Sequence, residues 1–442
     1  MSKVLSDSSF DQSVYWFRHA SPYINAHRGR TFVIHLDGEA LRTSGLDELI
    51  ADLALLSSLG IRLVVTYGMR PQLKESFAQH QLSWQEHQGR LIVNSERLQV
   101  LLTCAGALRT QLEARLSMGL PNSPMQGAGL RVLSGNLVTA RPLGIRDGVD
   151  LHSSGEVRRI QVKSINSLLD QGAIVLLPPL GYSATGETFD LDAEEVAMAA
   201  AIHLGADKLI LFGEDEGLKN PSGELIRDLS PDEAESWLNS LAATSTLHRH
   251  LEAACNACRR GVARAHLLSY QRSGALLQEL FTRDGDGTLI TQQRYENLRQ
   301  ARIEDVGGLL ALLRPLEEAG VLVRRSRELL EAEIERFTVI DLDGSIIACA
   351  ALYPYPEQQQ GELACVVVDP EYRQGQRGDR LLESLQKQAR ALGITQLFVL
   401  TTHTAHWFLE RGFLPAEVEQ LPAARRDLYN WQRNSRVFYK TL

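Results

Sequence analysis

A short stretch after residue 369 carries residues that could hold a phosphate group. Asp369 ends an apolar run, and an arginine- and glycine-rich turn separates it from a helix expected to begin at Asp379. Glycines let several backbone N–H groups point toward one place, and a helix N-terminus adds about half a positive charge there. Arg373, Arg377 and Arg380 add full positive charges. These residues predict a pyrophosphate-binding turn, and a tight strand-to-helix turn with a solvated basic face is the alternative.

The elements that must position such a turn are indicated by short apolar runs along the chain. The runs are mostly unbroken, which is typical of strands buried on both faces of a mainly parallel sheet. In the first 285 residues they fall at Thr31–Leu36, Arg62–Thr66, Ala173–Leu177, Lys208–Phe212 and Ala263–Ser269. Helix-like stretches such as Leu46–Leu59 and Glu194–Leu204 alternate with them. We therefore expect an α/β fold in which helices sandwich a mainly parallel sheet.

The character of the sequence changes around residues 282–298, where turn-forming and polar residues dominate. We place one domain at residues 1–285, a linker at 286–298 and a second domain at 299–442. An Asp-Gly pair at residues 343–344 predicts a hairpin turn in the second domain. The expected strands there are Ala301–Ile303, Phe337–Leu342, Ser345–Tyr353, Glu362–Asp369 and Gln396–Thr401, and the expected helices are Glu304–Leu313, Ser326–Arg336 and Asp379–Leu392.

The composition limits the class of protein. The chain has 442 residues, of which 44% are hydrophobic and 23% charged, as is ordinary for a soluble globular protein. Its net charge of −8 argues against a general nucleic-acid binder or a basic membrane-surface protein. No apolar segment is long enough to cross a bilayer, and residues 1–20 show no secretory pattern. Five scattered cysteines do not make a disulfide framework, so we expect a protein of the reducing cytoplasm.

Several segments resemble known families. The order Arg373-Gln-Gly375-Gln-Arg377-Gly378 after a buried strand resembles the acetyl-CoA loop of the GNAT acetyltransferases, and Trp407–Phe413 resembles their late helix and turn. Further segments resemble bacterial N-acetylglutamate synthases, and they are Ser21–Ile24, Leu59–Val64, Ser134–Asn136, Leu277–Thr282, Arg314–Glu328 and Arg433–Ser435. This resemblance implies an amino-acid-kinase-like domain followed by a GNAT fold, which is a mixed sheet with helices. It also implies an amino-acid N-acetyltransferase that moves the acetyl group of acetyl-CoA to L-glutamate in the first step of arginine biosynthesis.

The same resemblance implies roles for two residues in the acetyl transfer. A free α-amino group is largely protonated at neutral pH, so a base must remove its proton before it attacks a thioester. Glu362 is the implied base, and a solvated glutamate at a strand edge is the alternative. Thr401 is the implied proton donor to the CoA thiolate, and an ordinary strand threonine is the alternative. The implied reaction is direct transfer through a ternary complex.

The residues implied in binding form two groups. A dicarboxylate needs cationic partners, and arginine can hold a carboxylate in two places. The implied substrate-binding residues are Arg325, Cys365, Arg433 and Ser435. The implied cofactor-binding residues are Val366, Val367, Val368, Arg373, Gln374, Gly375, Arg377, Gly378 and Asp379. The apolar neighbours of Cys365 favour an inert thiol over a covalent acetyl carrier.

The first domain resembles the amino-acid kinases but lacks their ATP-binding residues. Active kinases have a Lys-x-Gly-Gly pattern on the first strand and a glycine-rich loop after the second. At the first-strand pattern this chain has His35 and Asp37 instead. In the loop after the second strand it keeps only Gly68. An anion near a triphosphate is costly away from water. We therefore expect no kinase activity.

A regulatory role is the expected alternative for this domain. Arginine-sensitive members of the fold bind arginine near the end of the domain, together with an N-terminal helix, and the matching segment here is Gly274–Thr288. The implied effector residues are Tyr15, Lys208, Glu279, Asp284, Gly285 and Gly287. Glu279 would pair with the guanidinium, and an exposed helix charge is the alternative. The resemblance thus implies inhibition by L-arginine through coupled sites, and a homohexamer.

Three residue pairs have spacings that can occur in metal or redox sites, namely Cys255/Cys258, His248/His250 and His403/His406. The cysteines lack a second pair, and the histidines lack acidic or cysteine companions at ligand spacing, so we predict no metal. Three rival functions remain open. They are a bifunctional kinase and acetyltransferase, a non-catalytic arginine sensor, and an acetyltransferase for a different amine.

Overall fold

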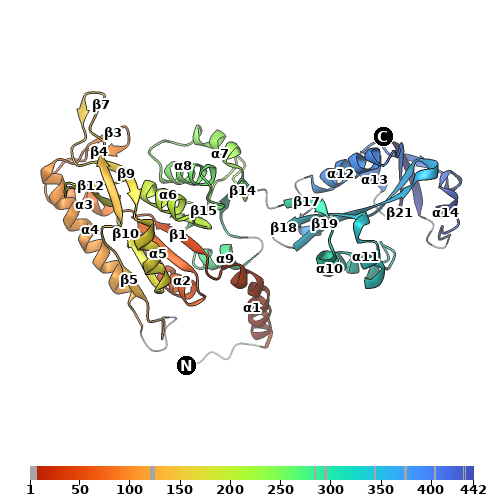
Figure 1. Cartoon of the computed structure of the whole chain (residues 1–442), viewed down its shortest axis with the longest axis horizontal. Coiled ribbons are helices and arrows are strands. Elements are labelled where there is room, and N and C mark those ends of the chain that lie inside the picture. Colours follow the sequence, from red (N-terminus) through yellow and green to blue (C-terminus); the bar gives the residue numbers. More distant parts are fainter. Residues whose placement is uncertain are drawn as a thin grey trace. The chain divides into compact units, whose positions relative to one another are not determined.

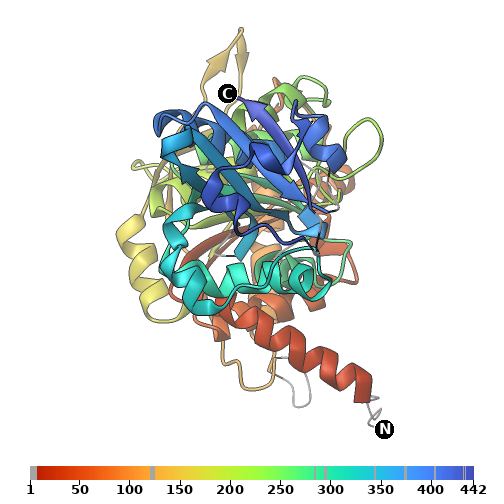
Figure 2. The same cartoon turned by 90° about the vertical axis from the view of Figure 1, so that its right-hand side faces the viewer.

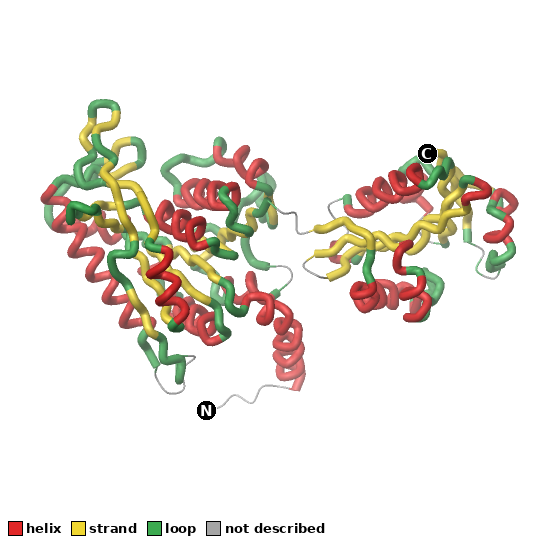
Figure 3. Tube along the Cα trace, in the orientation of Figure 1, coloured by secondary structure: helices red, strands yellow, loops and turns green. Residues whose placement is uncertain are grey.

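The computed structural model describes residues 7–119, 125–282, 285–292, 296–342, 345–372, 376–402, 405–431, 433 and 435–442. The chain divides into two compact units, residues 1–293 and residues 294–442 (Figure 1). In each unit the strands form a central layer with helices on both sides (Figure 3). The division falls within the segment that the sequence predicts as a linker.

An eight-stranded sheet forms the centre of unit 1. Its strands are β1 (Thr31–Leu36), β2 (Arg62–Tyr67), β5 (Arg131–Leu133), β10 (Ala173–Leu177), β13 (Lys208–Gly213), β14 (Asp228–Leu229), β15 (Arg264–Ser269) and β16 (Thr288–Ile290). They lie in the order β14-β16-β15-β13-β1-β2-β10-β5. All neighbours from β15 to β5 run parallel, whereas β16 pairs antiparallel with β15. The mainly parallel sheet predicted from the unbroken apolar runs is therefore confirmed.

Helices cover both faces of this sheet. They are α1 (Asp7–His27), η1 (Ala40–Arg42), α2 (Leu46–Ser58), α3 (Arg70–Gln79), α4 (Ser95–Leu116), α5 (Val162–Asp170), α6 (Ala193–Leu204), α7 (Pro231–Leu238), α8 (Thr246–Arg259) and α9 (Ala275–Phe281). Successive strand side chains point to opposite faces, so Ile34 packs with α2 and α4 into one core while Val33 packs with α5, α6 and α8 into another. The start of α1 extends away from unit 1 (Figure 2). Its last residue, His27, lies with Nε2 2.9 Å from the Leu280 carbonyl oxygen of α9.

A smaller sheet brings acidic residues to the carboxyl end of β1. Its strands, in spatial order, are β12 (Thr188–Asp190), β11 (Leu180–Tyr182), β6 (Val138–Pro142) and β9 (Gly155–Ile160). Two short hairpins pair β3 (Glu86–His87) with β4 (Arg90–Leu91), and β7 (Ile145–Arg146) with β8 (Val149–Asp150). After β12, the side chain of Asp192 accepts hydrogen bonds from the first backbone N–H groups of α6. This cap fixes where Glu194 enters the helix.

A seven-stranded mixed sheet forms the centre of unit 2. Its strands are β17 (Glu296–Gln300), β18 (Phe337–Leu342), β19 (Ser345–Tyr355), β20 (Gln360–Val368), β21 (Gln396–Thr401), β22 (Leu414–Ala416) and β23 (Arg436–Thr441). Their order is β17-β18-β19-β20-β21-β23-β22. Only β20 and β21 pair in parallel, and the other described neighbours are antiparallel. The mixed sheet implied by the resemblance is confirmed.

Helices also cover both faces of the second sheet. They are η2 (Ile303–Asp305), α10 (Val306–Glu318), α11 (Arg327–Ala332), η3 (Ile334–Arg336), η4 (Pro356–Gln358), η5 (Pro370–Tyr372), α12 (Arg377–Ala391), α13 (Ala405–Leu409), η6 (Val418–Gln420) and α14 (Ala423–Arg426). Leu381 and Leu385 of α12 pack on one face, whereas Leu309 and Leu313 of α10 pack on the other. No helix in the described part of the chain is long and apolar enough to cross a membrane.

The predicted strand at Ala301–Ile303 is wrong. Asp305 accepts hydrogen bonds from the Arg302 N–H at 2.7 Å and from the Arg299 guanidinium at 2.6 and 2.8 Å, and these bonds close the turn η2. The first strand of the sheet is instead β17. The segment predicted as a linker, residues 286–298, therefore contains β16 and the start of β17. Helix α12 begins at Arg377, two residues before the predicted Asp379.

Candidate functional site

Strands β20 and β21 separate in the middle of unit 2. Residues 360–363 of β20 pair with residues 396–399 of β21, and no later pair joins these strands among the described residues. The pairing of β20 with β19 shifts register near Cys365, whose φ is +50°. Such a bulge bends a strand and strengthens its twist. Beyond Cys365, the backbone groups of β20 on the side of β21 are therefore not paired with that strand.

Glu362 lies on β20 just before this bulge, and its side chain is buried. Its two carboxylate oxygens accept hydrogen bonds from Arg425 of α14, at 2.6 Å from Nε and 3.1 Å from Nη2. The Tyr355 hydroxyl lies 3.5 Å from the same carboxylate. Only 8% of Glu362 is exposed, so the alternative of a solvated strand-edge glutamate is wrong. Arg425, which fixes the orientation of the carboxylate, is not among the residues predicted from the sequence.

Arg325 lies beside Cys365 and the Tyr353 hydroxyl. Burial alone would lower the pKa of Arg325, but Cys365, Tyr353 and Glu333 outweigh it and raise that pKa. The Tyr353 hydroxyl donates to Glu333 at 2.7 Å. Burial also raises the pKa of the Cys365 thiol to about 11, so this thiol is protonated at neutral pH. The structure therefore places a permanent cation next to a thiol that is a poor nucleophile.

Arg433, Ser435 and Thr401 lie at the same end of the sheet. Arg433 donates from Nη2 to the carbonyl of Val321, which precedes Arg325 in the chain, and its Nε is buried without a hydrogen-bond partner in the described structure. The Ser435 carbonyl accepts from Tyr429 at 2.7 Å. Thr401, the last residue of β21, pairs with Arg436, the residue after Ser435. The fold thus gathers these predicted residues on neighbouring segments.

The predicted cofactor residues divide among three groups. Val366, Val367 and Val368 lie on β20 beyond the bulge. Arg373, Gln374 and Gly375 lie outside the described residues. Arg377 begins α12, and its guanidinium donates to the Tyr372 carbonyl at 2.9 Å. The Arg377 side chain is therefore folded back over the end of the preceding turn. The first-turn N–H groups of α12 have no partners within the helix, as at any helix start.

Gly378 and Asp379 also have packing roles. A Cβ at Gly378 would lie 2.8 Å from Cζ2 of Trp407, so the absence of a side chain lets α12 and α13 approach. Both carboxylate oxygens of Asp379 pair with Arg411, whose guanidinium stacks 4.1 Å above the Trp407 ring. The Asp379–Arg411 pair and the close approach at Gly378 hold the start of α12 in place. A contribution of Gly378 and Asp379 to cofactor binding would therefore come from their backbone groups.

In unit 1, Glu279 of α9 is a buried anion. Its carboxylate accepts hydrogen bonds from His266 Nδ1 at 2.6 Å and from the backbone N–H groups of Asp286 and Gly287 at 2.5 and 3.1 Å. Burial alone would raise the pKa of Glu279, but these donors outweigh it and lower that pKa to about 2. The side chain is only 7% exposed, so the alternative of an exposed helix charge is wrong.

Lys208 and His266 extend this network. The Lys208 ammonium lies 3.3 Å from His266 Nε2. Burial, followed by the charge of Lys208, lowers the pKa of His266 to about 4, so the imidazole is neutral. A neutral ring donates from Nδ1 to Glu279 and accepts at Nε2 from the ammonium. His266 is not among the residues predicted from the sequence, although a histidine inside the apolar run Ala263–Ser269 is a visible signal.

The turn after α9 requires glycine at two places. Gly285 has φ of +64°, and a Cβ there would lie 2.6 Å from Glu279 Oε2. A Cβ at Gly287 would lie 2.0 Å from the Leu267 carbonyl oxygen. Lys208, Glu279, Gly285 and Gly287 therefore lie near one another in unit 1. Asp284 and the side chain of Tyr15 lie outside the described residues.

A pocket of about 400 Å³ opens beside the start of α9. Its lining includes Glu48 and Asp52 of α2, together with Arg272 and Ser273. Burial and the charge of Glu48 raise the pKa of Asp52 to about 6. Two carboxyl groups give this pocket a preference for cations.

The two loops that bind phosphates in active kinases pack against each other here. A Cβ at Gly38 would lie 2.6 Å from the Pro71 ring, and Gln72 donates to the Gly38 carbonyl at 2.6 Å. The adjoining pocket is lined by acidic residues that include Asp190 and Asp192. Burial raises the pKa of each of these two carboxyl groups to about 7. Such a pocket is unfavourable for a polyphosphate.

Two family models match the chain. The amino acid kinase family matches residues 30–269, and the acetyltransferase (GNAT) family matches residues 308–413. Amino-acid acetyltransferases of Pseudomonas fluorescens (strain Pf-5) and Pseudomonas aeruginosa (strain PAO1) are each 56% identical over 429 residues, which cover 97% of this chain and 99% of theirs.

Two solved structures match along the same length. N-acetylglutamate synthase from Neisseria gonorrhoeae complexed with coenzyme A and L-arginine is 38% identical with a TM-score of 0.87, and the match covers 97% of this chain and 99% of that one. The same synthase complexed with coenzyme A and N-acetyl-glutamate is 39% identical with a TM-score of 0.62, at the same coverage.

Proposed function

Since the chain belongs to the family of the amino-acid acetyltransferases, we propose that it transfers the acetyl group of acetyl-CoA to the α-amino group of L-glutamate. The observation that supports this most strongly is the arrangement around the bulge of β20. A buried carboxylate, Glu362, lies on the strand that carries Cys365, and two arginines, Arg325 and Arg433, lie on segments that contact each other. In this proposal the enzyme acts in the first step of arginine biosynthesis.

The proposed reaction starts with removal of a proton from the glutamate ammonium group. Glu362 accepts that proton directly or through a water molecule, and one oxygen must then part from Arg425. The amine nitrogen attacks the thioester carbon and a tetrahedral oxyanion forms. Backbone N–H groups of Val366–Val368, beyond the bulge, are the proposed donors to this oxyanion. The C–S bond then breaks as Thr401 gives its hydroxyl proton to the CoA thiolate. Thr401 regains a proton as the nitrogen loses its second proton to become the amide, and the proton held by Glu362 passes to water.

Direct transfer is favoured over an acetyl-cysteine intermediate. A covalent carrier would need a thiolate at Cys365, whereas burial raises the pKa of that thiol to about 11. Arg325 and Arg433 are the proposed partners of the two glutamate carboxylates, with Ser435 beside them. Arg433 can exchange its hydrogen bond to the Val321 carbonyl for a carboxylate, which is a stronger, charge-assisted acceptor.

We expect L-glutamate to be the preferred acceptor in a panel of amino acids that includes aspartate, glutamine and α-aminobutyrate. An amino acid without the second carboxylate leaves one arginine unpaired, which costs binding free energy. Release of free CoA thiol from acetyl-CoA measures the rate for each acceptor. Equal rates across the panel would contradict the proposed substrate, and the absence of thiol release with every acceptor would favour the non-catalytic sensor.

The same protein tests the rival kinase activity. Incubation with ATP, Mg²⁺ and N-acetylglutamate is expected to give no phosphorylated product, because the Gly38 and Pro71 loops pack together and Asp37 lies where phosphates would bind. Sustained ADP formation that depends on N-acetylglutamate would show that the enzyme is bifunctional. Acetylation of a polyamine in preference to any amino acid would instead favour a different amine substrate.

Inhibition by L-arginine is a further part of the proposal. The similar synthase from Neisseria gonorrhoeae is complexed with L-arginine, and unit 1 holds a buried anion, Glu279, beside the turn Gly285–Gly287. A guanidinium at Glu279 would compete with the backbone N–H groups of Asp286 and Gly287 for the same carboxylate. Arginine binding would therefore rearrange this turn, and the coupling to unit 2 would begin there.

Replacing Glu279 with glutamine is expected to weaken the response to L-arginine at least tenfold. The amide keeps the size of the side chain but loses the charge that would pair with a guanidinium. The arginine concentration for half-maximal effect on thiol release measures the change. Asp52→Asn, in the neighbouring pocket, is the matched control and should keep the response. An unchanged response in Glu279→Gln, or its loss only in Asp52→Asn, would place the effector elsewhere.

The proposal also includes a homohexamer in the cytoplasm. Helix α1 presents Trp16 and Phe17 with exposed fractions of 43% and 63%, and large exposed apolar side chains favour an interface between subunits.

A further inference from the structure

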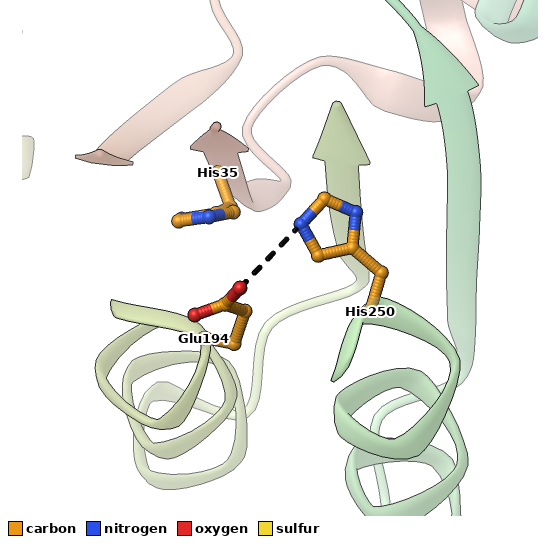
Figure 4. Close-up of side chains that lie close together, drawn as sticks. All are labelled: His35, Glu194 and His250. Carbon is orange, nitrogen blue, oxygen red and sulfur yellow. Dashed lines mark ion pairs between the residues drawn. The ribbon is translucent and has the colours of Figure 1, made fainter. Parts of the chain in front are cut away.

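Three ligand-type side chains lie together at the carboxyl end of β1, far from the acetyl-transfer residues in sequence. His35 comes from β1, Glu194 from the first turn of α6 and His250 from α8, and the three side chains point toward one another (Figure 4). They are 1%, 6% and 2% exposed. One ligand atom from each lies within 4.8 Å of the other two. The cluster adjoins the pocket at the former phosphate-binding loops, which His35 and Glu194 help to line.

Both imidazoles leave a nitrogen unused in this cluster. Nε2 of His35 and Nε2 of His250 are buried and have no hydrogen-bond partner in the described part of the chain. Leaving a buried polar atom unpaired costs free energy, so each nitrogen calls for a ligand. His35 Nδ1 lies 2.9 Å from Thr66 Oγ1. If Nδ1 donates to that hydroxyl, Nε2 carries the lone pair that a metal ion requires.

The charges around the three side chains are close to balance. Asp37, Asp190 and Asp192 line the same pocket as Glu194, and Arg70 and Arg90 face them. Arg249 also donates from Nε to Glu194 Oε1 at 2.9 Å. Three carboxyl groups besides Glu194 thus face three guanidinium groups, and the charge available to a bound cation comes from Glu194 itself.

We propose that His35, His250 and Glu194 bind one divalent transition-metal ion of the zinc type, with the fourth position open toward the pocket. Imidazole ligands suit Zn²⁺ and Co²⁺ better than Mg²⁺ or Ca²⁺, which prefer oxygen. Two histidines and a glutamate with one open position make a known zinc arrangement. Ligand atoms of a tetrahedral zinc ion lie about 3.3 Å apart, given bonds of about 2.0–2.1 Å.

The ligand atoms lie further apart than in this geometry, at 4.8 Å or less. His250 Nε2 and Glu194 Oε1 are 3.9 Å apart, so small side-chain rotations bring them to a common ion. The ion would join β1, α6 and α8, which also pack through apolar side chains, and Arg249 already links α8 to Glu194 of α6. This site is independent of the proposed acetyl transfer, because no residue of it belongs to unit 2.

The full-length protein, freed of metal with EDTA and then dialysed, tests the proposal by titration with Co²⁺. We expect one Co²⁺ per chain with the visible absorption of a tetrahedral site, competition by Zn²⁺, and a rise of about 5 °C in the unfolding midpoint at a hundredfold excess over the dissociation constant. His250→Asn and Glu194→Gln should each weaken Co²⁺ binding at least tenfold.

His80→Asn, at an exposed histidine, is the matched control and should keep the Co²⁺ spectrum. Circular dichroism shows whether each variant is folded, and His35→Gln provides the second histidine test if His250→Asn does not fold. The proposal is overturned if the wild-type protein gives no tetrahedral Co²⁺ spectrum. It is equally overturned if folded variants of His35 and His250 bind Co²⁺ as tightly as the wild type.

Discussion

Replacing Glu362 with glutamine is expected to lower kcat for acetyl transfer by about 10²–10⁴-fold, the range that a general base contributes. Glutamine has nearly the same shape, but its amide cannot take a proton from the acceptor ammonium group. The KM for acetyl-CoA should change little, because the side chain precedes the bulge of β20 and the proposed cofactor groups follow it. Steady-state rates of thiol release at saturating glutamate measure the effect.

The ion pair with Arg425 makes a control necessary. Glu362→Gln also weakens the two hydrogen bonds from Arg425, at 2.6 and 3.1 Å, and could move α14. Arg425→Gln breaks the same pair but leaves the carboxylate, so it should keep much more activity than Glu362→Gln. Raising the pH above the pKa of the acceptor amine should partly restore Glu362→Gln alone. A loss that is equal in both variants and independent of pH would contradict the role of a base.

The elements that could be predicted are those with strong local signals. The strands Phe337–Leu342 and Gln396–Thr401 match their predicted bounds, because each is a short run in which apolar residues dominate. The bulge at Cys365 could not be predicted, since a cysteine at φ +50° has no sequence signature. That bulge nevertheless decides which backbone groups of β20 can meet a ligand.

Partners from distant segments were harder to predict than the residues themselves. Glu362 follows from the resemblance, but its partner Arg425 lies 63 residues away among several other basic residues. In the same way, no acidic residue lies at ligand spacing from His250 in the sequence. This lack of an acidic companion was a reason for predicting no metal. Only the packing of α6 against β1 and of α8 against α6 brings Glu194 and His35 to it.

The second large effect is expected at the substrate carboxylates. Arg325→Ala should raise the KM for glutamate about 10²-fold, since losing one partner of a buried charge pair costs about 2–5 kcal/mol. Burial alone would lower the pKa of Arg325, but Cys365 and Tyr353 outweigh it and raise that pKa. The wild-type site therefore always presents a cation. The KM for acetyl-CoA should stay within about threefold, and initial rates at varied concentrations of each substrate separate the two constants.

A comparison of substrates shows whether Arg325 holds the side-chain carboxylate. If it does, Arg325→Ala should lose most of its preference for glutamate over glutamine, because the removed cation acted only on the charged substrate. Arg324→Ala is the matched control, since Arg324 is exposed next to Arg325 and should keep the wild-type preference. Equal losses for glutamate and glutamine would mean that Arg325 holds the α-carboxylate, which both substrates share. A similar loss in Arg324→Ala would mean that the effect is a general change of positive charge around the acceptor.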